Sequence, residues 1–391
     1  MITVDDALAR VLALSGPLEA EEIALHDGLG RVLAAPVRAR LTQPPFDAAA
    51  MDGYAIRRAD LGQQLRVIGE AGAGHPWQGT PAPGTALRIF TGAPVPAGYD
   101  AVIMQEHVLR EGDLIRVTEQ NSGLNIRPKG ADFVENSLFT LRRPLTPRDL
   151  ALIAAMNVAR ITVSRRPRVV IIAGGDELVP PGTVPGPGQI VSSNDIAIAA
   201  IAQSAGAVAE CLPIAADSAE SLLDRFERAA GADLIVTIGG ASVGDHDLIG
   251  KITETLGMER AFYRIRMRPG KPLIAGRVAG SAMLGLPGNP VSSIVCAELF
   301  MRPLLRAMQG LAPEDRLREG RLGADLGHEG DRQHYLRASL HRDGADIIVT
   351  PLGDQDSARL GLLAQADALL MRPAGDPARR QGEKVQFLAF D

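Results

Sequence analysis

The chain has 391 residues, with 41 basic and 46 acidic side chains and a net charge of −5 at pH 7. This length predicts several domains, and the weakly acidic balance argues against a broad nucleic-acid or anionic-membrane surface. With only two cysteines, neither a disulfide framework nor a cysteine zinc site is expected. A small-molecule partner in a reducing compartment is therefore favoured.

The first residues carry a polar helix signal instead of a signal-peptide pattern, and no apolar run reaches the roughly 18 residues of a membrane span. We therefore expect a cytoplasmic protein without a membrane or nucleic-acid partner. Thr3 should cap an amphipathic helix that ends before residue 15, and a second helical piece is expected over residues 27–33. Short β-like runs between glycines and prolines then predict a small β domain up to about residue 140. Thr146 should start a helix over residues 146–158.

Residues 168–308 alternate strand-like and helix-like segments. The continuous apolar run at 169–173 is typical of a parallel strand buried on both faces. Repeated βα units predict a doubly wound sheet, which binds ligands at the carboxyl ends of its strands. Further strands are expected at 210–214, 233–238 and 282–286, and helices at 194–205 and 248–256.

The predicted fold class is multidomain α/β: a doubly wound α/β domain, a mixed helical N-terminal domain and two small β domains. The last β domain follows a polar linker near residue 311 and has a barrel-like pattern. The expected boundaries are 1–43 with 140–166 for the helical N-terminal domain, 44–139 for a small β-rich domain, 167–311 for the α/β domain and 312–391 for the C-terminal β domain.

The sequence LPGNPVS at 286–292 follows an apolar strand and opens a helix. Asn289 has a side-chain oxygen suited to capping the first turn, and Pro290 suits the first helical position. Free backbone N–H groups and the positive end of the helix dipole would meet there, which favours an anionic ligand. On its own, such a corner is more often a plain strand-to-helix turn.

Glycine-rich loops follow two further strands, at residues 174–177 and 239–244. Neither matches a P-loop or a dinucleotide fingerprint, so a nucleoside triphosphatase or a dehydrogenase is disfavoured. Asp245 and Asp247 lie beside the second loop and Glu177 ends the first. Carboxylates beside a phosphate-binding loop are the usual arrangement for Mg²⁺, although either aspartate could instead cap a helix.

Arg264, Arg266 and Arg268 alternate, so a strand there would project all three from one face, and Lys271 follows a Pro-Gly turn. Such a face attracts oxyanions. A solvated edge strand, blunted by charge, is an equally open interpretation.

Five motifs occur together and in order: PPFDAAAMDGYA at 44–55, TGAPVPAG at 91–98, GDEL at 175–178, GGASVGDHD at 239–247 and LPGNPVS at 286–292. In this combination the chain resembles the MoeA-type molybdopterin molybdenumtransferase family, which includes the C-terminal region of gephyrin. The resemblance spans nearly the whole chain, and chance agreement of five separate motifs is implausible.

The resemblance implies a homodimer of four-domain subunits with a composite cleft, in which residues 1–43 with 140–166 form the dimerisation domain and residues 44–139 the lid domain. It also implies insertion of molybdate into adenylylated molybdopterin with Mg²⁺ and release of AMP, and other cofactor-biosynthesis enzymes as possible partners. Expected catalytic residues are Asp52, Thr91, Glu177, Asp217 and Asp247, with Asp247 and Asp245 at the metal. Expected substrate-binding residues are Arg127, Asp132, Gly240, Ser242, Arg264, Arg268, Lys271, Pro287, Gly288, Asn289 and Pro290.

The chain departs from the family pattern where a serine is expected shortly after the Gln355-Asp356-Ser357 turn, near Gly361. Two other functions remain open. A molybdopterin adenylyltransferase would account for residues 168–308 but leave the region around Asp52 unused. A non-catalytic molybdopterin-binding scaffold would need added partner-binding segments, for which the chain has no long linker.

Overall fold

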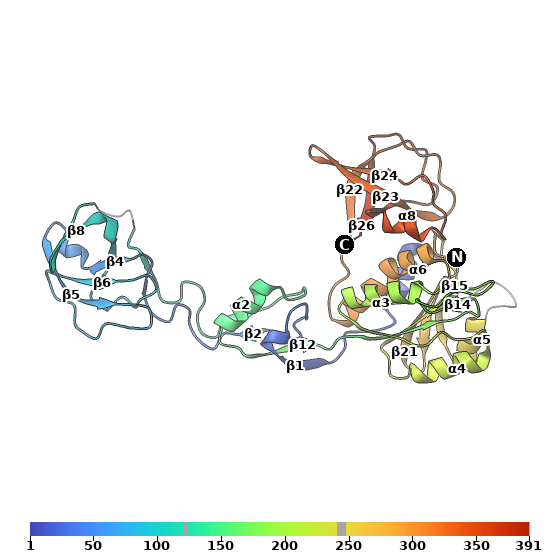
Figure 1. Cartoon of the computed structure of the whole chain (residues 1–391), viewed down its shortest axis with the longest axis horizontal. Helices are drawn as coiled ribbons and strands as arrows, with labels where there is room; N and C mark the ends of the chain where they lie inside the picture. Colours follow the sequence, from blue (N-terminus) through green and yellow to red (C-terminus); the bar gives the residue numbers. More distant parts are fainter. Residues whose placement is uncertain (120–122, 241–247, 391) are drawn as a thin grey trace. The chain divides into compact units, whose positions relative to one another are not determined.

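The computed structural model describes residues 1–119, 123–240 and 248–390. The chain divides into two compact units, one formed by Met1–Glu21 with Ser164–Asp391 and the other by Glu22–Val163 (Figure 1). Each unit has its own sheets and hydrophobic clusters. Among the described residues, no helix combines the length and apolar character needed to cross a membrane.

The first unit is built on a six-stranded sheet in the order β16-β13-β17-β21-β20-β18. The first four strands are parallel; β20 is antiparallel to β21, and the edge strand β18 is antiparallel to β20. The apolar runs of β13 and β17 are buried on both faces, as expected from their sequence. The strands are β13 (Arg168–Ala173), β16 (Val208–Cys211), β17 (Leu234–Ile238), β18 (Glu259–Phe262), β20 (Ile274–Val278) and β21 (Ser281–Leu286).

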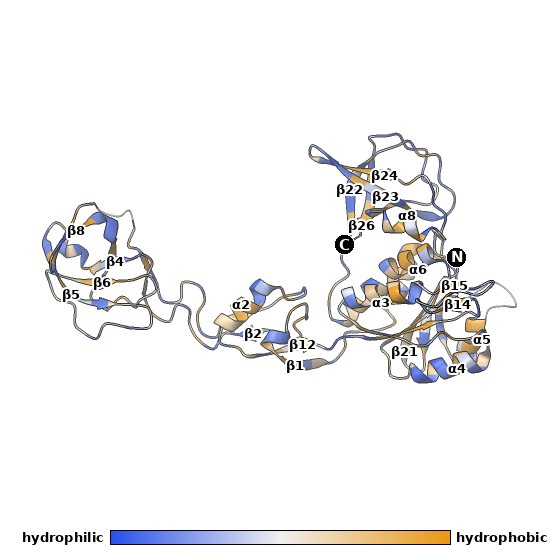
Figure 2. Ribbon diagram, viewed as in Figure 1, coloured by the Kyte–Doolittle hydropathy of each residue, from blue (hydrophilic) through white to orange (hydrophobic). Residues whose placement is uncertain are grey.

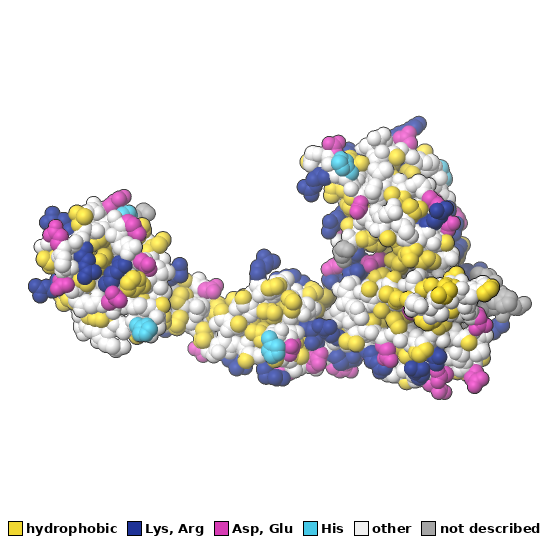
Figure 3. Space-filling model, viewed as in Figure 1, with side chains coloured by type: hydrophobic (Ala, Val, Ile, Leu, Met, Phe, Trp, Pro, Cys, Tyr) yellow, Lys and Arg dark blue, Asp and Glu magenta, His cyan; other side chains and the backbone are white. Residues whose placement is uncertain are grey.

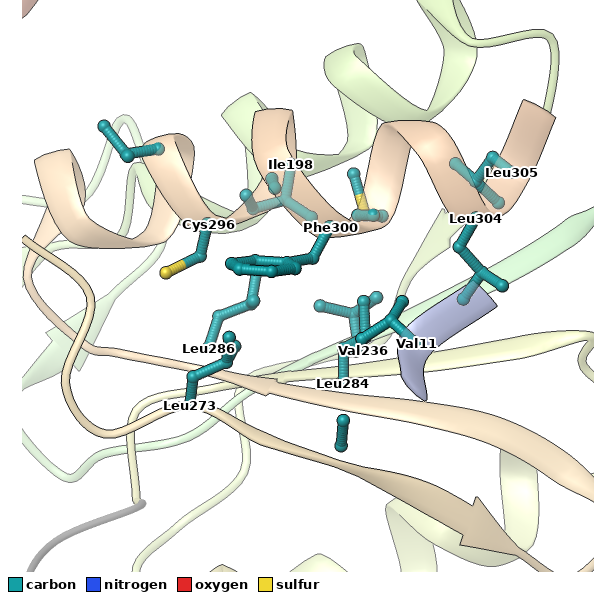
Figure 4. Packing of buried hydrophobic residues seen from close by; sticks show 14 of the residues in the cluster. Val11, Ile198, Val236, Leu273, Leu284, Leu286, Cys296, Phe300, Leu304 and Leu305 are labelled. Carbon is teal, nitrogen blue, oxygen red and sulfur yellow. The ribbon is translucent and has the colours of Figure 1, made fainter. Parts of the chain in front are cut away.

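Helices cover both faces of this sheet. On one face Phe300 packs between Ile198 of a neighbouring helix and sheet residues such as Leu284 and Val236 (Figure 4). In Figure 2 the helix α6 on this face is largely orange (hydrophobic), whereas α4 on the opposite face is largely blue (hydrophilic). The first face carries α3 (Asn194–Ser204), α6 (Pro290–Cys296), the π-helix η4 (Ala297–Met301) and α7 (Arg302–Met308), and the second carries α4 (Ala219–Arg228) and α5 (Leu248–Thr255). A short parallel pair, β14 (Leu178–Val179) with β15 (Ile190–Val191), leads from β13 to α3.

The first helix, α1 (Val4–Leu12), is capped by Thr3, whose hydroxyl accepts a hydrogen bond from the Asp6 N–H at 3.1 Å, as predicted. Its apolar face packs into the α/β core, although we expected residues 1–43 to form one N-terminal domain. Arg10 anchors the helix by donating to the Ala261 carbonyl at 2.8 Å. The four-way division of the chain remains a prediction.

The C-terminal strands of the first unit close into a small barrel, because β23 pairs with both β24 and β25. The barrel core includes Phe387 and Val349, both fully buried. The elements are β19 (Met267–Arg268), β22 (Leu317–Leu322), β23 (Gln333–Asp343), β24 (Asp346–Pro351), α8 (Leu360–Ala364), β25 (Ala368–Arg372) and β26 (Lys384–Ala389).

The second unit contains a six-stranded sheet in the order β7-β4-β6-β5-β9-β8. Its helix α2 (Pro147–Ala155) begins with the predicted Thr146, which forms a capping box with Asp149. The strands of the sheet are β4 (Gly53–Ile56), β5 (Gln64–Ala71), β6 (Thr85–Ile89), β7 (Ala101–Met104), β8 (Val108–Glu111) and β9 (Leu114–Val117).

The remaining elements of this part of the chain are short. The helix expected over 27–33 is wrong: only the 3₁₀ turn η1 (Leu25–Asp27) forms. Gly28 lies too close to Leu150 for a Cβ, and Gly30 has a φ of 72°. The other short elements are β1 (Ala20–Ala24), β2 (Val37–Arg38), β3 (Ala48–Ala49), η2 (Arg58–Asp60), η3 (Gln105–His107), β10 (Ile126–Arg127), β11 (Leu138–Phe139) and β12 (Arg160–Ser164). The multidomain α/β fold class predicted from the sequence is confirmed.

Candidate functional site

A cavity of about 520 Å³ opens at the carboxyl ends of β13, β17 and β21. Its wall includes Glu177, Lys271 and the corner at residues 287–290, together with Asn194 at the start of α3 and Ala358 from the C-terminal barrel. Hydrophobic side chains gather over the β14–β15 segment beside it (Figure 3), where Ile190 and Val191 are exposed. The position agrees with the rule that open α/β sheets bind ligands beyond the carboxyl ends of their strands.

The corner after β21 is held from two sides. Pro290 takes the first position of α6, as predicted, and the buried Ser293 hydroxyl donates to the Pro287 carbonyl oxygen. The amide nitrogen Nδ2 of Asn194 donates to the Gly288 carbonyl oxygen at 2.6 Å. Since the corner is fixed by side chains of two helices, its backbone presents a preformed edge to the cavity.

The expected capping of α6 by the Asn289 side chain is wrong. Asn289 makes no side-chain cap; its Nδ2 instead donates to Oγ of Ser357 at 3.0 Å. The Val291 N–H donates to the Ser357 carbonyl oxygen at 3.1 Å. A loop from the C-terminal barrel therefore satisfies a backbone donor at the first turn of the helix.

Ser357 is the residue that sequence reasoning missed at this site. Gly361, near which the family pattern predicts a serine, lies exposed in α8, whereas Ser357 contacts the corner. The available signal was the Gln355-Asp356-Ser357 turn itself. The contact of Ser357 with Asn289, which lies 68 positions earlier in the chain, cannot be predicted from the local sequence pattern.

The strand ends approach each other closely at Gly239. This residue has a φ of 77°, and a Cβ placed on it would lie 3.2 Å from the Gly174 carbonyl oxygen and 4.0 Å from Cα of Gly288. Glycine is required both by the left-handed backbone and by this approach. The neighbouring Gly240, a predicted substrate-binding residue, has a φ of 64° and faces Ile249; it is absent from the cavity wall among the described residues.

Carboxylates lie at two adjacent strand ends. The Asp217 N–H donates to Oδ1 of Asp176 at 3.0 Å, and the Asp176 N–H donates to Oδ2 of Asp217 at 3.4 Å. This exchange places Asp217 beside the loop that carries Glu177, whereas Glu177 itself reaches the cavity wall. The predicted Ser242, Asp245 and Asp247 lie outside the described residues. Within the described ranges, no three histidine, cysteine or carboxylate side chains cluster as a metal site.

The basic segment forms only in part as predicted. Only Met267–Arg268 is a strand, because the chain first bridges Ile2 at Ile265 and then pairs with β23. Arg264 and Arg268 are nevertheless exposed with Ile265 buried between them, so the alternation persists. Lys271 lies in the cavity wall, and neither arginine does.

The second unit holds the pair Asp52 and Thr91. The Thr91 N–H and hydroxyl both donate to Oδ1 of Asp52, at 2.8 and 2.7 Å. These bonds, with a smaller contribution from Arg88, hold the pKa of Asp52 below its ordinary value. Arg88 lies 5.1 Å from the ring centre of Tyr54 and donates to the Gly53 carbonyl oxygen at 3.1 Å, which fixes the strand that follows Asp52.

The other two predicted residues of this unit are exposed. Arg127 lies in β10, which pairs with β3, and Asp132 follows in a loop where its N–H donates to the Gln43 carbonyl oxygen at 3.1 Å. The structure thus brings Glu177, Lys271 and the corner together in one wall of the first unit, and it pairs Asp52 with Thr91 within the second unit.

The fold and the cavity define a multidomain α/β protein with a ligand site at the strand ends of its doubly wound domain. Three family models match the chain in order: the MoeA N-terminal region (domain I and II) over residues 2–157, a probable molybdopterin binding domain over 170–307, and the MoeA C-terminal region (domain IV) over 319–390. The chain belongs to the MoeA family of molybdopterin molybdenumtransferases.

Individual relatives agree. The molybdopterin molybdenumtransferase of Nostoc sp. is 36% identical over 96% of this chain and 90% of its own length. That of Bacillus subtilis is 32% identical over 99% of this chain and 94% of its own. A crystal structure of a molybdopterin biosynthesis MoeA protein from Pyrococcus horikoshii has a TM-score of 0.86 at 30% identity, covering 100% of this chain and 99% of that one.

Proposed function

We propose that this chain inserts molybdate into adenylylated molybdopterin, with Mg²⁺-dependent release of AMP, during molybdenum cofactor biosynthesis. The observation that supports this most strongly is the strand-end cavity, whose wall, apart from Ala358, lies in the segment matched by the molybdopterin-binding family model. A pterin phosphate, a diphosphate bridge and an oxyanion need backbone N–H groups and a cation. The corner at 287–290 and Lys271 supply these two features.

The proposed roles follow the chemistry of the residues. Lys271 would attract the oxyanion from the cavity wall, with Arg264 and Arg268 adding positive potential from the neighbouring exposed segment. Pro287, Gly288, Asn289 and Pro290 would border the pterin end. We assign a catalytic role to Asp52 and Thr91 and a substrate-binding role to Arg127 and Asp132. Substrate binding would also involve Gly240 and Ser242 of the second glycine-rich loop.

A magnesium ion fits the chemistry of the donors. Mg²⁺ is commonly held by one or two carboxylates together with substrate phosphates, so a dedicated cluster of three protein ligands is not required. Glu177 and Asp217 supply carboxylates at two strand ends, and Asp245 and Asp247 are the proposed ligands. When bound, the ion would neutralise charge on the diphosphate.

The test is to incubate the protein with adenylylated molybdopterin, Mg²⁺ and molybdate, and to follow AMP and metal-bound cofactor together. We expect both products in equal amounts, and neither when molybdate or Mg²⁺ is omitted. A Lys271→Ala variant should need a higher molybdate concentration for its half-maximal rate. Release of AMP without any metal-bound cofactor would contradict the insertion step.

The proposal includes a homodimer with a composite cleft, cytoplasmic action and transfer of the product to other cofactor-biosynthesis enzymes. Sedimentation should give twice the chain mass at micromolar concentration. An inactive Asp52→Asn variant mixed with an inactive Asp247→Asn variant should regain activity, since one intact cleft can form in a mixed dimer. A monomer, or a mixture without recovered activity, would refute the composite cleft.

A further inference from the structure

Arg337 is an unusual buried cation. It lies on β23, is only 1% exposed, and has the largest of the fully buried side chains in the described part of the chain. Its guanidinium donates to main-chain carbonyl oxygens: Nη1 to Asp356 at 2.8 Å and Nη2 to Asp354 at 3.1 Å. Burial lowers its pKa from the ordinary value, because charge is costly away from water. Such a cation is tolerable only when its donors are satisfied.

The same loop closes around Arg337 through Gln355. Its Oε1 accepts from the Arg337 N–H at 2.9 Å and from Nε at 3.3 Å. Its Nε2 donates to the carbonyl oxygens of Arg337 at 3.0 Å and Leu352 at 2.8 Å. Arg337 and Gln355 thus hold residues 352–356 together with local bonds, among them the Leu352 N–H to the Arg337 carbonyl oxygen at 2.8 Å and the Asp356 N–H to Oδ1 of Asp354 at 2.8 Å.

The far side of this loop contacts the candidate site. Ser357 accepts hydrogen bonds from Asn289 and from the Val291 N–H, and Ala358 lies in the cavity wall. A continuous set of bonds therefore runs from the core of the barrel to the first turn of α6. If the Asp354 and Asp356 carbonyl oxygens lost the donors of Arg337, the loop would no longer be held in one conformation, because these carbonyls would then bind other partners.

We infer that Arg337 is a positioning residue: through the loop at 354–358 it holds Ser357 against the corner and so shapes one wall of the cavity. For substrate binding, this inference rests on the proposed function of that cavity. Lysine is a poor replacement, since an ammonium group offers three donors from one point, whereas the planar guanidinium offers five in a fixed fork.

A matched control exists in the same barrel. Arg372 on β25 is 2% exposed and is equally anchored, but its partners are Asp376 and the carbonyl oxygens of Gly327 and Pro377. None of these residues lies in the wall of the strand-end cavity. A loss of barrel stability alone should therefore appear in both Arg337→Lys and Arg372→Lys.

The first measurement is amide hydrogen exchange of the segment 287–296 without ligand. In Arg337→Lys the Val291 amide should exchange at least tenfold faster than in the wild type, while Arg372→Lys leaves it unchanged. If Arg337→Lys does not fold, Gln355→Ala keeps the cation, removes the amide clamp and should give the same localised increase. Unchanged exchange at Val291 in a folded Arg337→Lys or Gln355→Ala variant would overturn the inference.

The second measurement is binding of molybdopterin as the probe. Arg337→Lys should weaken binding at least fivefold, and Asn289→Ala should weaken it too. The affinity of the double variant Arg337→Lys/Asn289→Ala should fall by less than the product of the two single-variant factors, because both changes release the same loop. Fully multiplicative losses would overturn the inference. Failure of the wild type to bind would refute the proposed function but leave the exchange result intact.

Discussion

Replacement of Gly239 by alanine tests the close approach of the strand ends. Gly239 has a φ of 77°, and the added Cβ would lie 3.2 Å from the Gly174 carbonyl oxygen. The left-handed backbone alone costs an alanine about 1–2 kcal/mol. The close contact between the added Cβ and the Gly174 carbonyl oxygen should also displace the loop at 174–177, because a backbone oxygen cannot rotate away as a flexible side chain can.

Gly257 provides the matched control. Its φ is 73°, and nothing lies within 4 Å of an added Cβ. Gly257→Ala should therefore share the cost of the left-handed backbone without moving the cavity wall. Both variants should unfold at slightly lower temperature, by a few degrees for each kcal/mol lost.

The assay is molybdopterin binding, measured with both variants at a temperature where circular dichroism shows them folded. We expect Gly239→Ala to bind at least tenfold more weakly, equivalent to about 1.4 kcal/mol, and Gly257→Ala to bind like the wild type. Equal affinities for Gly239→Ala and Gly257→Ala would refute the reasoning that these strand ends form the binding wall.

Three further changes have defined outcomes. Thr91→Ala removes a hydroxyl bond but keeps the backbone bond to Asp52, so NMR titration should show the pKa of Asp52 raised part of the way to its ordinary value. The ionised Asp52 carboxylate stabilises the fold above its unfolded pKa, and this stabilisation is lost as the pH falls through its folded pKa. In Thr91→Ala this contribution to the free energy of unfolding should be smaller. Arg268→Ala should raise the molybdate concentration at half-maximal rate more than Arg268→Lys does. The difference in this concentration between Arg268→Ala and the wild type should become smaller at high salt, because salt screens the charge of Arg268. A difference that does not change with salt would contradict an electrostatic role. Exposed Cys211 should react with a thiol reagent in the native protein, while Cys296, buried with its thiol pKa raised, should react only after denaturation.

The sequence predicted the central sheet well because its signals are local. The run of β13 is apolar from Val169 to Ala173, and β17 and β21 are followed directly by a glycine and a proline, respectively. Pro290 marks the first position of α6 correctly because its fixed φ and missing N–H suit only that place. The position of the cavity followed from this pattern alone, through the rule for open α/β sheets.

The missed features depend on distant parts of the chain. Asn289 has the right chemistry to cap α6, but Ser357 competes for its side chain and occupies the backbone donor. The amphipathic pattern of α1 showed that one face is buried, not that it packs on the α/β core. The basic segment was expected to be one strand, yet Ile265 and Met267 pair with different partners.

The most direct test of the central claim is amide hydrogen exchange with and without saturating molybdopterin. The three strand-end segments, at residues 174–177, 238–240 and 287–294, should all exchange more slowly with ligand, because each contributes to one wall. Strand β24 of the C-terminal barrel should be unaffected and serves as the internal reference. Bound ligand with unchanged exchange at all three strand ends would contradict the assignment of the cavity as the molybdopterin site.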